Sequence, residues 1–219
     1  MTDEHNSFDP DFTLGTPSIV CRWRLSGASL PMENRHLRAL GKRVGPSGKP
    51  VSCDLIAWAK QHIEWTLKEG ASRHPEGTLM VVIDEEGRAA MSVGPYEPLE
   101  DLRFASLLGR IDLSYREGEK TGVPPETIWA VVEGVLCWGL DEQESPSGAA
   151  TLVEDLAKTL GIRVERRPGL LNLVRSRQVI PSEVFFVSDE HGIVLPDELS
   201  GEMGEKFASG YRRLLERSK

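Results

Sequence analysis

The sequence predicts an α+β fold of two lobes, in which mixed sheets pack against helices. Short runs rich in β-branched residues, such as 78–83 (TLMVVI) and 183–187 (EVFFV), are typical of buried strands. Segment 52–70 repeats apolar residues at steps of three and four, which is the spacing of an amphipathic helix. Because both kinds of segment occur early and late in the chain, each lobe is expected to combine strands with helices.

Composition divides the chain into four parts. Residues 1–16 are polar and carry no apolar period, which predicts a flexible lead-in. We expect a small α/β lobe over 17–98 and a C-terminal α/β lobe over 123–219. Residues 99–122, framed by prolines and charged residues, are interpreted as the connection between the lobes.

The first lobe is expected to begin with a strand and to contain one well-capped helix. The strand over 18–25 meets Ser26-Gly27, which predicts a hairpin with 28–30. Ser52 is a suitable N-cap for a helix that ends at Gly70. The other elements expected in this lobe are a short helix over 31–40 and strands over 78–83 and 88–93.

The second lobe is expected to begin with a hairpin that turns at Glu133-Gly134. Gly161 is a suitable C-cap for its first helix, whose inward face carries a leucine every fourth residue. The elements expected in this lobe are strands over 126–132, 135–138, 162–165, 183–187 and 193–195 and helices over 151–160 and 202–216.

Charge and cysteine content exclude several classes of protein. The 219 residues carry a net charge of -8, which argues against a surface that neutralises nucleic-acid phosphates. Cys21, Cys53 and Cys137 are too far apart for a thiolate metal site and odd in number, which favours a reducing cytoplasm. The acidic N-terminus does not resemble a signal peptide, and no apolar run reaches the roughly 20 residues of a membrane span. We therefore expect a cytoplasmic protein with no nucleic acid, membrane or metal partner.

Few residues suggest chemistry, because phosphate loops, nucleophile elbows and metal-binding helices are all missing from the sequence. Asp189, Glu190 and His191 share a turn after a strand, where a rigid sheet can present acid and base groups, although turns are also commonly polar. His36, between two arginines, could bind an anion, but a solvated helix face is favoured. Cys137 lies in an apolar strand, where a thiol usually packs rather than reacts.

Several segments together resemble a known family in their order along the chain. The segments are 23–40 (WRLSGASLPMENRHLRAL), 126–138 (ETIWAVVEGVLCW), 151–165 (TLVEDLAKTLGIRVE), 181–196 (PSEVFFVSDEHGIVLP) and 204–215 (GEKFASGYRRLL). In this order they resemble the fold-type IV family of pyridoxal phosphate enzymes, which includes the class IV aminotransferases and aminodeoxychorismate lyase. The resemblance implies a small N-terminal α/β lobe, a larger barrel-like C-terminal lobe, a cofactor between them, and a homodimer.

The chain departs from this family at the positions that would carry the chemistry. The resemblance implies a lysine that forms a Schiff base with the cofactor, but no lysine lies between Lys68 and Lys120, and arginine is no substitute as a nucleophile. Ala39 stands at the position of a phosphate-binding arginine, with Arg38 beside it, and the segment that should bear the lysine is shortened. Asp189 lies near the position of a phosphate-binding threonine, where its charge would repel a phosphate.

Three hypotheses follow. The first is a class IV aminotransferase-like protein without catalysis or cofactor, which binds a small molecule or a partner subunit. The second is an active pyridoxal phosphate-dependent aminotransferase or lyase, acting on an amino acid or an aminodeoxychorismate-like substrate, with Lys120 and Glu126 as catalytic residues. The third is a protein-interaction domain unrelated to the cofactor. Under the resemblance, the residues expected around the cofactor position are Arg38, Ser188, Asp189 and His191, together with Glu126.

Overall fold

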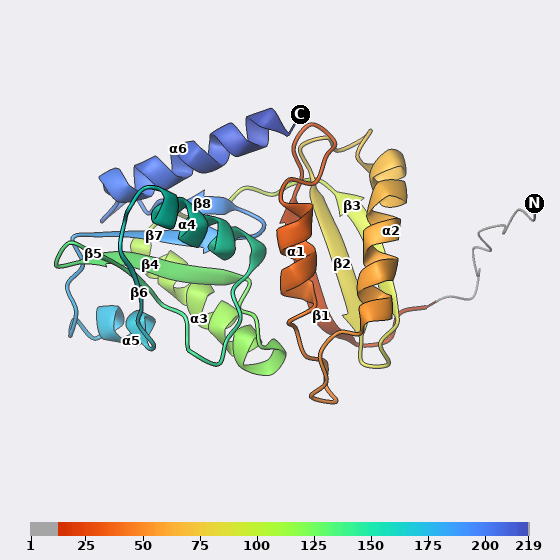
Figure 1. Cartoon of the computed structure of the whole chain (residues 1–219), viewed down its shortest axis with the longest axis horizontal. Helices are drawn as coiled ribbons and strands as arrows, with labels where there is room; N and C mark the ends of the chain where they lie inside the picture. The colour runs from red at the N-terminus through yellow and green to blue at the C-terminus, as the bar shows by residue number, and fades with distance from the viewer. Residues whose placement is uncertain (1–12, 219) are drawn as a thin grey trace, which may run out of the picture.

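The computed structural model describes residues 13–218 and arranges them as two lobes that lie side by side (Figure 1). Each lobe combines one sheet with helices. The predicted α+β, two-lobed fold is therefore confirmed. Most of the predicted lead-in, residues 1–12, lies outside the described residues.

The first lobe is a three-stranded antiparallel sheet in the order β1-β2-β3, covered on one face by two helices. Alternate residues of the first strand, Ile19, Cys21 and Trp23, pack against these helices in the core of the lobe. The elements of this lobe are β1 (Pro17–Arg24), α1 (Glu33–Leu40), α2 (Cys53–Gly70), β2 (Thr78–Asp84) and β3 (Ala89–Gly94).

Two local predictions in this lobe have different outcomes. Ser52 caps α2 as expected, since its side chain accepts a hydrogen bond from the amide of Leu55. The predicted hairpin with 28–30 is wrong, because β1 pairs with β2 and only a single bridge joins Ser26 to Ser29. Pro31 lacks an amide hydrogen and ends any ladder that this short segment could begin.

The second lobe is a five-stranded sheet in the order β6-β5-β4-β7-β8 with helices on both faces. Side chains alternate along β4: Ile128 and Ala130 face α3 and α5, whereas Trp129 and Val131 face α4 and α6. Trp129 stacks on Trp138 with ring centroids 4.6 Å apart, so both residues belong to the core, as predicted. The elements are α3 (Phe104–Thr121), β4 (Glu126–Val132), β5 (Val135–Trp138), α4 (Gly148–Thr159), β6 (Val164–Arg166), α5 (Leu170–Arg175), β7 (Glu183–Ser188), β8 (Gly192–Val194) and α6 (Glu202–Arg217).

The segment 99–122 is not an irregular connection, which corrects the sequence-based interpretation. It contains the 18-residue helix α3, which buries Leu107, Leu108 and Ile111 against the second sheet. The prolines that suggested a linker flank the helix rather than interrupt it, and its charged C-terminal half lies largely on the exposed side. The irregular connection between the lobes is therefore shorter than expected.

Ion pairs between the lobes fix their relative position. The guanidinium of Arg43, which is only 2% exposed, donates to Glu117 of α3 at 2.8 Å and to the Thr121 hydroxyl at 3.3 Å. Arg35 of α1 donates to Asp155 of α4 at 2.8 Å. Because these contacts come from both sides of the boundary, the cleft between the lobes has a defined shape.

Glu183 caps the last helix, and this contact can be tested. Both of its carboxylate oxygens lie 3.1 Å from the amide of Met203, the second residue of α6. We expect Glu183→Ala to lower the free energy of unfolding by about 1–2 kcal/mol, because it removes a buried acceptor from a helix N-terminus. Urea unfolding measures the change. Glu202→Ala, in the same first turn but exposed, is the control and should change stability by about 0.5 kcal/mol or less. Equal losses in the two variants would contradict the capping role.

Candidate functional site in the cleft between the lobes

The cleft lies where β1, α3 and the turn between β7 and β8 meet. Along β1, Val20, Arg22 and Arg24 alternate with the buried residues Cys21 and Trp23, so they project from the face of the sheet that the helices leave open. Two neighbouring cavities lie along the boundary between the lobes, and Glu190 lines both of them.

The smaller cavity, of about 220 Å³, is strongly charged. Arg110 of α3 donates to Glu126 at 2.6 Å, and the hydroxyl of Ser188 donates to the same carboxylate at 3.0 Å. Arg22 projects into this cavity and forms no ion pair within the described part of the chain. Because Glu117, Asp189 and Glu190 also line this cavity, its carboxylates outnumber its arginines.

The larger cavity, of about 490 Å³, combines an apolar wall with a polar end. Its polar end contains Arg24, whose guanidinium carbon lies 3.3 Å above the centre of the Tyr96 ring. The hydroxyl of Tyr96 lies 3.3 Å from Nδ1 of His191. The apolar wall consists of Leu99, Leu102, Ile193, Val194, Leu195 and Leu215.

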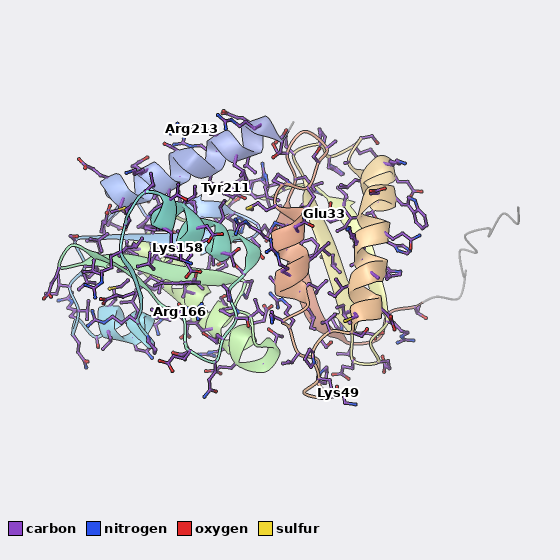
Figure 2. The ribbon with its side chains drawn as sticks, viewed as in Figure 1. Glu33, Lys49, Lys158, Arg166, Tyr211 and Arg213 are labelled. Atoms are coloured by element: carbon purple, nitrogen blue, oxygen red, sulfur yellow. The ribbon has the colours of Figure 1, made fainter. Side chains whose placement is uncertain are left out.

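Two polar atoms on the larger cavity have no hydrogen-bond partner. They are Nη1 of Arg24 and the hydroxyl of Tyr211, both of which are buried. In Figure 2, Tyr211 lies on the side of α6 toward the body of the lobe, whereas Arg213 points away from it. Burying a polar group without a partner costs roughly 1–3 kcal/mol, so both atoms are suited to a ligand that supplies an acceptor.

Burial shifts the pKa values of His191 and Glu190, which lie in the turn between β7 and β8. Desolvation lowers the pKa of His191 to about 4, with Arg110, Arg24 and Arg22 adding to the effect, although Glu126 opposes it. The imidazole is therefore neutral at pH 7 and does not compete with Arg24 for an anion. Burial also raises the pKa of Glu190, against the lowering effect of Arg22.

Asp189 borders the smaller cavity, and its carboxylate lies in the boundary between α1 and α4. Its Oδ1 accepts a hydrogen bond of 2.7 Å from the amide of Ala149, in the first turn of α4. Its Oδ2 lies 3.6 Å from Nδ1 of His36, which is an ion-pair distance rather than a hydrogen bond. Burial by itself would raise the pKa of Asp189, but His36, the Ala149 amide and Arg43 outweigh it and lower the pKa below the ordinary value.

The structure brings four of the six predicted site residues together. Glu126, Ser188 and Asp189 line the smaller cavity, and His191 lines the larger one. The structure does not place Arg38 or Lys120 on either cavity.

The expected position of Arg38 in the cleft is wrong. Arg38 is exposed on α1 and donates to the carbonyl of Asn34. Residues two positions apart lie on nearly opposite sides of a helix, and the inward position in this turn belongs to His36, which is 1% exposed. The favoured interpretation of His36 as a solvated residue is therefore also wrong. Lys120 is exposed at the C-terminal end of α3, where its neighbour Thr121 takes the buried position.

Sequence reasoning missed the aromatic residues and one arginine of the cleft. Arg110 lay in the segment interpreted as a connection, and Tyr96 lay before it without a periodic pattern. Tyr211 fitted the apolar face of α6, and nothing in that pattern indicates that its hydroxyl lacks a partner. Only Arg22 and Arg24 carried a usable signal, because two arginines alternate on one face of a strand.

Within residues 13–218, no group of three or more histidine, cysteine, aspartate or glutamate side chains has the geometry of a metal site. None of the helices in that same range has the length and apolar character needed to cross a membrane.

Solved structures identify the fold. No family model and no curated protein matches the chain. A putative branched-chain amino acid aminotransferase from Thermotoga maritima aligns with a TM-score of 0.62 and 16% identity, over 91% of this chain and 86% of that one. The 4-amino-4-deoxychorismate lyase from Pseudomonas aeruginosa aligns with a TM-score of 0.62 and 13% identity, over 90% of each chain. A hypothetical aminotransferase from Mycobacterium tuberculosis in its pyridoxal phosphate-bound form has a TM-score of 0.61 and 12% identity, over 96% of each chain.

These alignments span both lobes and nearly the whole length of each relative. They account for the order of the segments noted in the sequence, from the β1 region to α6. The chain therefore has the fold of the class IV aminotransferases and aminodeoxychorismate lyases, which is fold type IV of the pyridoxal phosphate enzymes.

Proposed function

We propose that this chain is a class IV aminotransferase-like protein that binds a small molecule in the cleft without pyridoxal phosphate chemistry. The observation that carries the proposal is the lining of the cleft. It offers two buried donors without partners, on Arg24 and Tyr211, but none of the described lysines lies on either cavity.

The residues present do not fit pyridoxal phosphate. Schiff-base chemistry needs a lysine amine beside the aldehyde carbon. Lys120, the nearest candidate in sequence, is exposed at the end of α3, and it lines neither cavity. Near the position where the resemblance implies a phosphate-binding threonine, the Asp189 carboxylate already accepts from the amide of Ala149. The expectation of Lys120 and Glu126 as catalytic residues thus lacks support, since Glu126 is held by Arg110 and Ser188.

The larger cavity favours a small carboxylate with an apolar body. Its volume of about 490 Å³ falls in the range of small-molecule sites. Arg24 is stacked on Tyr96, so its guanidinium is already oriented and loses little side-chain entropy on binding. A carboxylate could accept from Arg24 while its hydrocarbon part covers the leucine-rich wall. A homodimer, as the resemblance implies, stays a separate prediction.

The first test is reduction with borohydride in the presence of pyridoxal phosphate. We expect no stoichiometric label on any lysine by intact mass and peptide mapping, because none of the lysines within residues 13–218 lies on either cavity. We also expect no aldimine absorbance band. A single labelled lysine, above all Lys120, would contradict the proposal and favour the active enzyme.

A second test concerns the ligand. We expect monocarboxylates from acetate to phenylacetate to raise the melting temperature increasingly, because the longer apolar bodies bury more of the leucine wall. Arg24→Met, which keeps an unbranched apolar stem but removes the guanidinium, should weaken this stabilisation at least tenfold in apparent Kd. Differential scanning fluorimetry measures both effects.

The matched control is Arg163→Met on the exposed surface outside both cavities. It should leave the apparent Kd unchanged. The same response in both variants, or no response of the unsubstituted protein to any member of the series, would rule out a carboxylate site at Arg24.

A further inference from the structure

We infer that the carboxylate of Asp189 is a built-in anion, which fills the anion-binding position at the N-terminus of α4 and so excludes an external phosphate there. The inference concerns a different part of the boundary from the larger cavity, and it does not depend on what that cavity binds.

The position is built as an anion site. Ser147 caps α4 with its side chain, which accepts from the amide of Ala150. The cap leaves the amide of Ala149, in the same turn, available to another acceptor. Helix N-termini carry a partial positive charge and unsatisfied amide hydrogens, which together attract anions. Oδ1 of Asp189 meets this donor at 2.7 Å.

A second element of the position comes from the other lobe. His36 of α1 is 1% exposed, and neither ring nitrogen has a hydrogen-bond partner. Its ring stacks on Trp23 with centroids 5.1 Å apart, and its Nδ1 lies 3.6 Å from Oδ2 of Asp189. A buried imidazole without a hydrogen-bond partner can accept or donate to a ligand here, and among residues 13–218 the carboxylate at ion-pair distance is that of Asp189.

The surroundings leave no room for a second anion. A Cβ atom added to Gly148 would lie 2.6 Å from Nδ1 of His36, so the start of α4 is already in contact with the imidazole. Asp189 is also fixed by its backbone: its carbonyl accepts from the amide of Arg24 at 3.2 Å, and its amide donates to the carbonyl of Pro125 at 3.4 Å. An entering phosphate would have to displace the Asp189 carboxylate from the amide of Ala149, and the two like charges would repel each other.

The experiment is chemical rescue of Asp189→Ala. Removing the carboxylate leaves the Ala149 amide and His36 without their anion, and we expect the melting temperature to fall by about 5–10 °C. Formate and inorganic phosphate should then raise the melting temperature of this variant saturably, beyond chloride at equal ionic strength. All titrations of this experiment are made in the Arg24→Met background, which removes the carboxylate-binding guanidinium of the larger cavity, and Arg24→Met with Asp189 intact should show no such anion-specific rise. If the variant is unfolded in chloride, the same titration is followed as recovery of its native fluorescence.

Two further variants separate an anion site from general destabilisation. Asp155→Ala removes the exposed carboxylate that pairs with Arg35 across the same boundary, and formate should not rescue it specifically. Asp189→Asn retains an acceptor of nearly the same size, so it leaves no space and should not respond to added anions. The inference is overturned if Asp189→Ala gains no more from formate or phosphate than from chloride, or if the Arg24→Met background with Asp189 intact gains equally from them.

Discussion

The relative position of the two lobes depends on a buried carboxylate that meets groups from both of them. Asp189 stands at the end of β7, yet its side chain receives an amide from α4 and faces an imidazole from α1, while its backbone bonds to the end of β1. A buried charge is tolerated only where several partners offset its desolvation, so these elements must assemble together. The cleft cavities open directly beside this turn, on residues 188, 190 and 191. The geometry of the cleft is consequently set by the same Asp189 contacts that hold the two lobes together.

The alternation of side chains along strands explains how one chain builds both a core and a cleft. In β1, the odd-numbered residues Ile19, Cys21 and Trp23 enter the first core, which leaves Val20, Arg22 and Arg24 facing the second lobe. In β4, both faces are covered by helices, so the strand is apolar throughout its central residues. The difference between a half-covered and a fully covered sheet thus decides which strand can carry arginines, and it places them at the boundary rather than in a core.

Much of this fold could be predicted from local pattern, whereas the site could not. The capped helix α2, the strand 183–188 and the hairpin at Glu133-Gly134 follow from caps, β-branched runs and turn residues, which act over a few positions. Helix α3 was missed because its flanking prolines and exposed charges masked a modest apolar stripe. His36 was misjudged because flanking arginines suggest solvent, although helical rotation turns the histidine inward and the arginines outward. Tyr96 and Tyr211 come together only through tertiary packing, which no spacing within the sequence encodes.

The cations that line the two cavities determine what the cleft can bind. Its cations are arginines, whose guanidinium groups stay protonated and can bind or orient an anion but cannot attack a carbonyl carbon. Its histidine is neutral, because burial lowers the pKa to about 4, and the one glutamate with two hydrogen-bond donors, Glu126, is held in an ion pair. Glu190, which borders both cavities, has a raised pKa, and Arg24 and Tyr211 retain unused hydrogen-bonding capacity. Under the proposed function, Arg24 and Tyr211 bind and orient the ground state of a small carboxylate, which is what affinity requires.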